Sequence, residues 1–205
     1  MNNSVVNTGR LVGAALRMLL VLTAVTGIAY PLAVTGIAQG LFHDQANGSI
    51  VRAGGKDVGS ALIGQTWNID GTEKPDPAWF QPRPSNSGYD PLATGSGQLG
   101  ASDATLTRTV ADTKKAVAAF NGVPESDVPK DAVTGSGSAI DPHISPAYAR
   151  LQVKRVAEAN GLTVRQVTAL VERHTEGRTA GFLGQPHVNV LRLNLALKDL
   201  AAATG

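Results

Sequence analysis

A single uncharged apolar stretch near the N-terminus constrains this chain more than any other feature. Residues 18–38 read MLLVLTAVTGIAYPLAVTGIA and contain no charged side chain. As an α-helix this stretch spans roughly 31 Å, about the thickness of the hydrocarbon core of a bilayer. No later stretch is comparable, so the sequence predicts one transmembrane helix at 18–38 and a polar domain at 43–205.

The charges around this stretch predict its orientation. Arg10 and Arg17 are the only charged residues before Asp44, in a chain with 18 Lys and Arg and 16 Asp and Glu. The net charge of +2 therefore belongs to the N-terminus, and the rest of the chain is neutral. Because cationic flanks stay on the cytoplasmic side, residues 1–17 are expected inside and the large domain outside.

A cleavable signal peptide is the alternative interpretation, because Gly36 and Ala38 precede Gln39 as small residues would at a cleavage site. The apolar run exceeds the core of about 7–15 residues usual in a signal, which favours a retained helix. Either interpretation places the domain outside the cytoplasm. In a retained helix, small residues allow close helix–helix approach, and Pro31 is expected to kink it because proline cannot donate to the carbonyl of Gly27. The small residues are Ala24, Gly27, Ala29, Ala33 and Gly36.

The composition excludes several classes of site. The chain has no cysteine, which rules out thiol catalysis and Cys-ligated zinc or iron–sulfur centres. Among its four histidines, His174 and His187 could in principle ligate a metal together with Glu176, but surface or capping roles are the favoured interpretation. The polar domain is neutral and has no basic run, so no nucleic-acid partner is expected.

The fold class predicted for the domain is α+β (mixed α/β), with short strands first and helices in the C-terminal half. Two or three short strands are expected between residues 48 and 67, from Ile50-Val51, Val58 and Leu62-Ile63, with a hairpin turn at Gly54-Gly55. Residues 68–102 are rich in proline and glycine but also hold aromatic residues. Disordered linkers are poor in aromatics, so we expect an ordered loop.

Four helices are predicted after this loop from apolar periodicity and capping residues. The first covers 103–120 with Ser102 as its N-cap. The second covers 147–160 behind Ser145-Pro146, a favoured cap and first residue. The third starts at Thr163 and ends at Gly177, and the fourth covers 188–203.

Two segments resemble catalytic or nucleotide-binding motifs. Ser138, Asp141 and His143 lie close together in the turn at 135–146 and suggest a hydrolase, but triad residues usually converge from distant positions. A turn leading into the Ser145 cap is the simpler interpretation. The glycine-rich stretch at 94–99 could face a phosphate, but it lacks the Gly-Lys-Ser/Thr end of a P-loop and fits a tight turn.

A third segment is a candidate partner-binding surface. Arg83 lies between Pro82 and Pro84, whose rings stiffen the backbone, and aromatic residues flank it. Such an arginine can anchor a partner or form an internal salt bridge. The candidate partner-binding residues are Trp79, Phe80, Arg83 and Tyr89.

Four motifs in this order, behind one apolar helix, closely resemble the C subunit of the Kdp-type potassium-transporting ATPase. The resemblance covers roughly residues 15–200. The motifs are GSALIGQTW, WFQPRPSNSGYDPLATGSGQLGAS, VTGSGSAIDPHISPAYARLQVKRVAEANGL and TEGRTAGFLGQPHVNVLRLNLAL.

The resemblance implies a non-catalytic accessory subunit of an ATP-driven, high-affinity potassium uptake pump in the bacterial inner membrane. It implies three partners: a channel-like potassium-translocating subunit, a P-type ATPase catalytic subunit and a small one-helix peptide. ATP and potassium would be handled by these partners, with no cofactor bound directly by this chain. The expected roles are assembly and stabilisation of the complex, shaping of the external potassium entrance, and assistance to ATP use by the catalytic subunit. The chain lacks the Asp-Lys-Thr-Gly-Thr phosphorylation motif of P-type ATPases.

The family has also been associated with nucleotide binding, which the resemblance carries over to Gln98 and Gln152. An external domain is difficult to reconcile with contact to cytoplasmic ATP. The other function hypothesis is a free-standing exported hydrolase or binding module, built on the Ser138 turn or on the aromatic loop.

Overall fold

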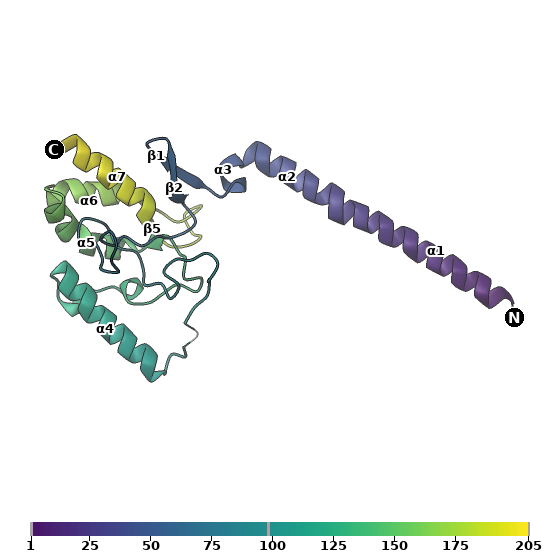
Figure 1. The fold of residues 1–205 in the computed structure, drawn as a ribbon, viewed down its shortest axis with the longest axis horizontal. Helices are drawn as coiled ribbons and strands as arrows, with labels where there is room; N and C mark the ends of the chain where they lie inside the picture. The colour runs from purple at the N-terminus through teal and green to yellow at the C-terminus, as the bar shows by residue number, and fades with distance from the viewer. Residues whose placement is uncertain (1, 98, 205) are drawn as a thin grey trace. The chain divides into compact units, whose positions relative to one another are not determined.

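The computed structural model of the chain divides into two compact units, Met1–Ser49 and Ile50–Gly205. It describes residues 2–97 and 99–204. The fold is mixed α+β, as predicted, with small antiparallel sheets and most of the helices in the C-terminal half of the chain (Figure 1).

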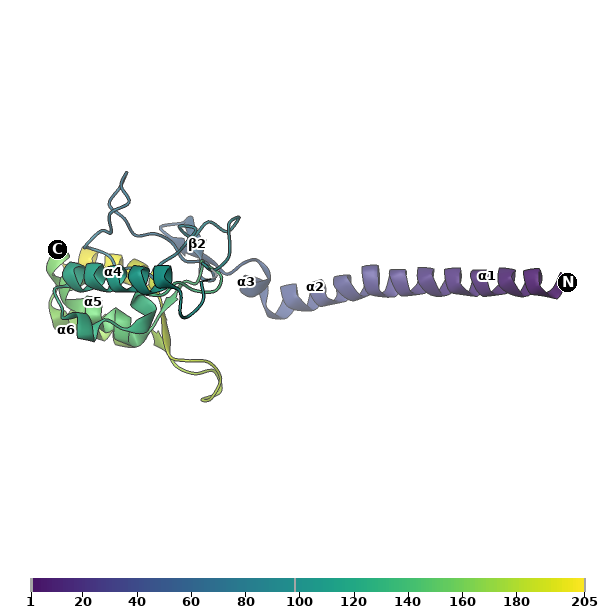
Figure 2. The ribbon, with the colours of Figure 1, turned by 90° about the horizontal axis from the view of Figure 1, so that it is seen from below.

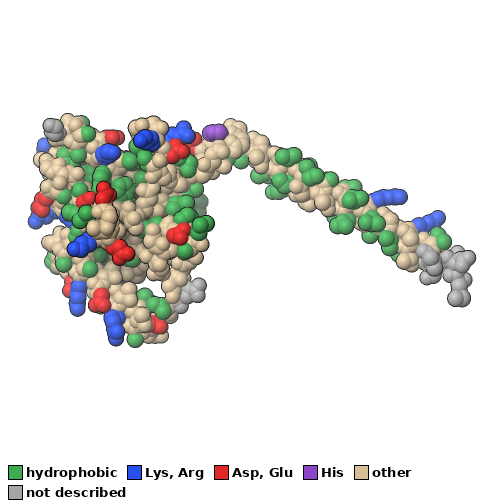
Figure 3. Space-filling view, in the orientation of Figure 1, with side chains coloured by type: hydrophobic (Ala, Val, Ile, Leu, Met, Phe, Trp, Pro, Cys, Tyr) green, Lys and Arg blue, Asp and Glu red, His purple; other side chains and the backbone are tan. Residues whose placement is uncertain are grey.

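The first unit is helical almost throughout. It contains α1 (Asn2–Ala24), a π-helical turn η1 (Val25–Ala29), α2 (Tyr30–Leu41) and the short α3 (His43–Ala46). By length and composition, Val6–Leu41 could cross a membrane. From residue 6 to residue 49 no side chain is buried, and hydrophobic side chains line the visible face of the helix (Figure 3). Such a surface is stable in lipid or against other apolar helices.

A wider helical turn lies just before Pro31, where a kink is predicted from the sequence, and the kink itself stays a prediction. The backbone N–H of Tyr30 donates to the carbonyl of Val25, five residues back, and Pro31 stands in the first turn of α2. Thr26 Oγ1 also donates to the carbonyl of Leu22 at 2.7 Å. Proline removes one i→i−4 bond, and a π-helical turn accommodates that loss without ending the helix.

The second unit begins with the predicted hairpin. Strands β1 (Ile50–Ala53) and β2 (Lys56–Ser60) pair antiparallel, with Ala53 opposite Lys56 across Gly54-Gly55. Both glycines have positive φ, 58° and 77°, as a two-residue hairpin turn requires. The strand expected at Leu62-Ile63 was wrong, because residues 61–63 form a turn in which Leu62 N donates to Ser60 Oγ at 3.1 Å.

A second sheet was not predicted from the sequence. Strands β3 (His143–Ile144), β5 (His187–Asn189) and β4 (Thr175–Glu176) pair antiparallel in the order β3-β5-β4. These strands are too short to show a two-residue periodicity. They also correct two helix boundaries: the third helix ends at Arg173 instead of reaching Gly177, and the last helix starts at Val190 instead of Val188.

Four helices follow the loop, as predicted, and Figures 1 and 2 show them gathered to one side of the β1–β2 hairpin. They are α4 (Ala104–Asn121), α5 (Pro146–Ala159), α6 (Val164–Arg173) and α7 (Val190–Thr204). Two short 3₁₀ turns lie between α4 and β3 in the chain: η2 (Glu125–Asp127) and η3 (Lys130–Ala132).

Side-chain caps fix three of these helix starts. The predicted caps at Ser145 and Thr163 are confirmed, since Ser145 Oγ accepts from Tyr148 N at 3.0 Å and Thr163 forms a capping box with Gln166. The cap of α4 is Asp103 and not Ser102. Asp103 Oδ1 accepts from Thr105 N at 2.6 Å, and this bond is the main cause of the lowered pKa of its carboxyl group.

The core of the second unit lies between α5, α6 and α7, and Phe80 from the proline-rich loop is part of it. Phe80 is 0% exposed, as are Val156, Val167 and Leu193 from the three helices. The loop at 68–102 is therefore ordered, as predicted, because one of its aromatic side chains completes the core. The other buried core residues on these helices are Tyr148, Ala149, Val153, Ala157, Leu170, Val171, Val190 and Leu197.

Phe80→Ala should destabilise the protein strongly, by about 3–5 kcal/mol, because it leaves a cavity at the centre of the core. Urea unfolding of the full chain in detergent, followed by tryptophan fluorescence, measures the change. Leu92→Ala is the matched control. Leu92 is 95% exposed in the same loop, so this change should alter the free energy of unfolding by no more than about 0.5 kcal/mol. Equal effects of both variants would contradict the assignment of Phe80 to the core.

Candidate functional site

A distinctive feature of the second unit is the backbone segment 77–81, which runs from the surface at Pro77 to the buried Phe80 and Gln81 and is held by side chains instead of by a neighbouring strand. At Phe80, the backbone N–H donates to Asn194 Oδ1 at 2.9 Å and the carbonyl accepts from Asn194 Nδ2 at 3.0 Å. Asn160 Nδ2 donates to the carbonyl of Ala78 at 2.8 Å. A carboxamide offers both a donor and an acceptor, so it can replace a missing backbone partner.

Gln152 makes the same reciprocal pair with Gln81. Gln81 N donates to Gln152 Oε1 at 2.7 Å, and Gln152 Nε2 donates to the Gln81 carbonyl at 3.0 Å. Gln152 is 0% exposed. A nucleotide could reach its carboxamide only if this pair broke. The other residue associated with nucleotide binding, Gln98, lies outside the described residues.

Arg155 holds the same segment as a buried cation whose hydrogen bonds, among the described residues, go to uncharged acceptors. Its guanidinium donates to the carbonyls of Pro77 and Trp79, to Asn121 Oδ1 at 2.9 Å and to Gln152 Oε1 at 2.7 Å. Burial lowers the pKa of Arg155 to about 10, so the side chain stays charged at neutral pH. We call Gln152, Arg155, Asn160 and Asn194 the amide clamp.

The guanidinium of Arg155 also lies 4.3 Å from the ring centroid of Phe120, which ties α5 to α4 through a cation–π contact. Two tryptophans pack beside the clamped segment. The ring centroids of Trp67 and Trp79 are 5.2 Å apart at an angle of 44°. Trp79, one of the predicted partner-binding residues, is half-buried, so part of its side chain stays at the surface.

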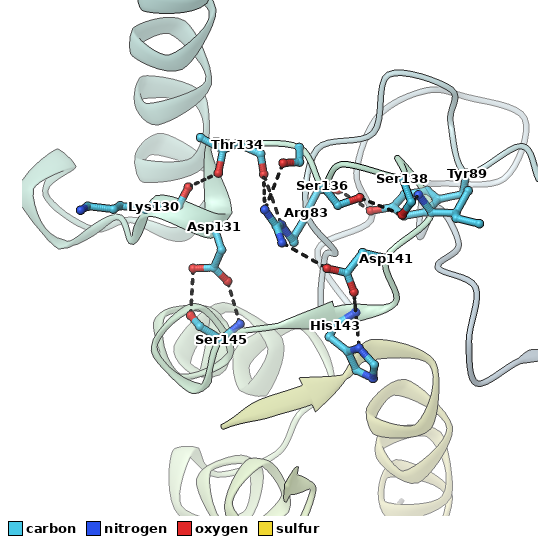
Figure 4. A network of polar contacts seen from close by, with 12 residues as sticks. Arg83, Tyr89, Lys130, Asp131, Thr134, Ser136, Ser138, Asp141, His143 and Ser145 are labelled. Atoms are coloured by element: carbon cyan, nitrogen blue, oxygen red, sulfur yellow. Dashed lines mark hydrogen bonds and ion pairs between the residues drawn. The ribbon is translucent and has the colours of Figure 1, made fainter. Parts of the chain in front are cut away.

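Arg83 lies in a second polar network, drawn in Figure 4. Its Nη1 is 3.1 Å from Asp141 Oδ2, and its Nη2 donates to the carbonyl of Gly135 at 3.0 Å. Its Nε and Nη2 also donate to the carbonyl of Thr134. These bonds match the internal salt bridge that was left open from the sequence. They fasten the proline-rich loop onto the turn at 134–141.

Tyr89 belongs to the same network. Its hydroxyl donates to the carbonyl of Arg83, and its N–H donates to Ser85 Oγ at 3.0 Å. Burial raises the pKa of Tyr89 above its usual range. A Cβ atom at Gly64 would lie 2.4 Å from the Tyr89 ring, so glycine is required there. Phe80 and Tyr89 are thus buried in the second unit, and the guanidinium of Arg83 is bonded within it. Their role in partner binding stays a prediction.

The suspected hydrolase residues do not form a relay. Ser138 Oγ lies 3.3 Å from Ser136 Oγ and accepts from Ile140 N, and among the described contacts His143 is not one of its partners. Asp141 Oδ1 is 3.4 Å from His143 Nδ1 and accepts from His143 N at 3.0 Å. Although burial opposes it, these bonds and the charge of Arg83 lower the pKa of Asp141. The bonds of Asp141 to His143 and Arg83 hold the start of β3 in place.

The other two suspected sites have structural roles as well. In the glycine-rich turn at 94–99, Gly95 N donates to the carbonyl of Ser138 at 2.9 Å, which joins the two turns. His187 Nε2 lies 3.7 Å from Glu176 Oε2 across β4 and β5. His187 also makes an edge contact with His143, at 4.3 Å between ring centroids. Among the residues that the structure describes, no group of three His, Asp or Glu side chains could hold a metal ion.

A mostly apolar groove of about 280 Å³ separates α4 from the proline-rich loop. Thr113, Val117 and Phe120 from α4 form one wall, and Pro82 and Pro84 form the other. Several polar side chains that line the groove, among them Gln81, Arg83 and Asn121, already bond inside the domain. The groove is better suited to holding the proline-rich loop in one conformation than to binding a reacting molecule.

The network around Arg83 predicts a measurable cost for its loss. Arg83→Ala should lower the free energy of unfolding by about 2 kcal/mol, because it leaves Asp141 and two carbonyls without their donor. Arg52→Ala is the matched control: Arg52 pairs with Asp57 at 2.7 Å on the exposed surface, where a pair contributes about 0.5 kcal/mol or less. Urea unfolding of both full-length variants tests this. An unchanged midpoint for Arg83→Ala would show that its contacts contribute nothing to the fold.

Comparison with known proteins identifies the family. The model of the KdpC family, described as K+-transporting ATPase, c chain, matches residues 12–199. The potassium-transporting ATPase KdpC subunit of Streptomyces avermitilis is 54% identical over 100% of both chains. That of Kineococcus radiotolerans is 48% identical over 98% of this chain and 100% of the relative. That of Mycobacterium tuberculosis is 49% identical over 91% and 96%. The chain therefore belongs to the KdpC family of potassium-transporting ATPase subunits.

Proposed function

We propose that this chain is a non-catalytic accessory subunit of an ATP-driven potassium uptake pump. It crosses the bacterial inner membrane once, assembles with the other pump subunits and stabilises them, and its external domain shapes the entrance for potassium. The observation that carries this proposal is the pairing, in one chain, of an uncovered apolar helix with a domain whose buried side chains Gln152, Arg155 and Asn194 bond within the domain itself.

The helix supplies the membrane part of the role. A pore needs several helices around it, so a chain with one candidate span cannot form a potassium pathway alone. Its uncovered surface can contact lipid or the helices of a partner. Small residues such as Gly27 and Gly36 allow a partner helix to approach closely. Assembly within the membrane is therefore a natural role for this segment.

The orientation follows from charge. Arg10 and Arg17 precede most of the apolar segment, and no acidic residue occurs before Asp44. The positive-inside rule puts this end in the cytoplasm and the second unit outside. An external domain is separated from cytoplasmic ATP, and Gln152 is buried in its pair with Gln81. We therefore assign ATP hydrolysis to a P-type catalytic subunit and potassium translocation to a channel-like subunit.

The non-catalytic role is supported by what the polar groups do. Ser138 has no relay to His143 among the described contacts, and Asp141 is held by Arg83 and His143. These groups fasten loops to one another. Such rigidity suits a domain that presents fixed surfaces to its neighbours. Within the predicted partner-binding set, Trp79 and Arg83 both keep some surface, and because Arg83 is already bonded to Asp141 we assign Trp79 to a contact in the assembled pump.

The membrane helix should specify assembly and not only anchor the chain. Replacing residues 18–38 by an unrelated apolar helix of equal length should reduce co-purification with the other pump subunits by about tenfold or more, since close packing at small residues is lost. The measurement is the yield of this chain after affinity capture of the channel-like subunit. A wild-type chain that fails to co-purify would contradict the proposed function; equal yields would assign all binding to the external domain.

Protease added to intact spheroplasts should digest the second unit, because the arginines hold the N-terminus inside. Antibodies against a tag at each end would detect loss of the C-terminal tag and protection of the N-terminal one. Arg10→Glu with Arg17→Glu is the control variant and should increase the fraction of protected domain. Full protection of residues 43–205 in the wild-type chain would reverse the assigned topology, and release of a soluble product beginning near Gln39 would indicate a cleaved signal.

A further inference from the structure

The groove between α4 and the proline-rich loop contains a buried polar group that the fold leaves without a partner. Tyr148, on the first turn of α5, lines this groove and is 4% exposed. Among the described residues its hydrogen bonds are made by its backbone, as at the helix cap, where its N–H donates to Ser145 Oγ at 3.0 Å. Its hydroxyl bonds to none of the side chains or carbonyls of those residues. An unpartnered hydroxyl in an apolar groove is a group that a ligand can use for orientation.

The Tyr148 hydroxyl is open to the groove and acts as a hydrogen-bond donor. Among the described residues, Trp67 Nε1 is the one fully enclosed side-chain polar atom that lacks a partner. The Tyr148 hydroxyl lacks a partner too, so it is not fully enclosed and meets the space that its side chain lines. Burial raises the pKa of Tyr148 above its usual range, so the hydroxyl keeps its proton at neutral pH. A ligand that uses this donor must supply an acceptor, such as a carbonyl oxygen.

The other buried polar side chains of the groove are already bonded. Gln81 Nε2 donates to two backbone carbonyls, at 2.7 and 3.0 Å, and Asn121 Oδ1 accepts from Arg155 at 2.9 Å. Among the described residues that line the groove, Arg83 alone is charged, and its guanidinium lies 3.1 Å from the carboxylate of Asp141. A charged ligand would therefore find no unpaired opposite charge, and burying a charge without a partner is costly. The groove suits an uncharged ligand.

The walls and the volume of the groove favour a small aromatic ligand. Tyr89, Phe120 and Tyr148 line it. The Phe120 ring is held by the guanidinium of Arg155, which lies 4.3 Å from the ring centroid. Aromatic rings pair through offset or edge-to-face contacts, which a bound ring can make with these walls. The volume of about 280 Å³ is roughly twice that of an apolar cavity that binds benzene. The groove therefore has room for a molecule of about ten to fifteen non-hydrogen atoms.

We propose that this groove binds an uncharged aromatic carbonyl compound, whose carbonyl oxygen accepts a hydrogen bond from the hydroxyl of Tyr148. The compound is held there and does not react. Bound between α4 and the proline-rich loop, it stabilises the second unit by mass action, because it binds the folded form. The site lies within this chain, so its occupancy does not depend on the proposed function. The competing occupant is water, which satisfies the hydroxyl but makes no use of the aromatic walls.

Photolabelling of the full chain in lipid nanodiscs tests this site. The probe is benzophenone, an uncharged aromatic ketone that attaches to nearby C–H bonds when it is illuminated, and mass spectrometry locates the label. We expect labelling of residues 82–89 and 113–120 to saturate as the probe concentration rises, while labelling of the uncovered helix at 6–41 rises without saturation. Tetralone should suppress the saturable labelling at about tenfold lower free concentration than tetralin, which has the same rings without the carbonyl. Labelling that never saturates, or equal suppression by both compounds, would overturn the proposal.

The variant Tyr148→Phe removes the hydroxyl alone. It should keep the wild-type urea midpoint, because the hydroxyl has no partner among the described residues, while the saturable labelling at low probe concentration falls by about tenfold. The advantage of tetralone over tetralin should disappear with it. Tyr30→Phe removes a tyrosine hydroxyl from the first unit, where Tyr30 is 67% exposed, and should change neither labelling nor midpoint. Wild-type labelling by Tyr148→Phe would contradict the proposal, and so would a clearly lowered midpoint, which would show that the hydroxyl is bonded within the fold.

Discussion

The fold of the second unit depends on one substitution of partners: side-chain amides take the place of a β-strand beside residues 78–81, where the chain passes into the core at Phe80. The Phe80 side chain is part of the core between α5, α6 and α7, so the backbone of Phe80 is buried as well. An unpaired buried backbone group costs about as much as a lost hydrogen bond. Asn194 and Gln152 remove that cost by pairing with Phe80 and Gln81, and Arg155 binds the carbonyls on either side of Ala78. The proline-rich loop can therefore run through the interior without regular structure.

This solution links parts of the chain that are far apart in sequence. Gln152 and Arg155 lie three residues apart on α5 and thus share a face, and Arg155 reaches Asn121 and the Phe120 ring at the end of α4. The same loop is fastened a second time, through Arg83, to Asp141 just before β3. The proline-rich loop thus bonds to α5, to α7 and to the turn before β3. These polar bonds add to the apolar core in holding the second unit together.

The sequence predicted the features that local chemistry determines. Gly54-Gly55 marks a hairpin turn because only positive φ closes it, and Ser145 and Thr163 mark helix starts because their hydroxyls reach the following N–H groups. Features that depend on distant partners could not be predicted. The sheet β3-β5-β4 forms between segments of two or three residues, and the burial of Phe80 depends on Asn194, more than a hundred positions away. Arg83 was left between two roles because its acceptors, Asp141 and two carbonyls, are known only once the chain has folded.

The two units need different surroundings, and this difference limits which surfaces a partner protein can contact. The helix from residue 6 to residue 41 buries none of its side chains by itself, so its stable environment must come from lipid or from other helices. The second unit bonds most of its buried polar groups internally, although Trp67 Nε1 is buried without a partner, and it exposes few adjacent large apolar side chains. Because Phe80 and Gln152 are buried within the second unit, a partner can use them only by disrupting the fold. A partner that leaves the fold intact can therefore contact only side chains that stay at the surface.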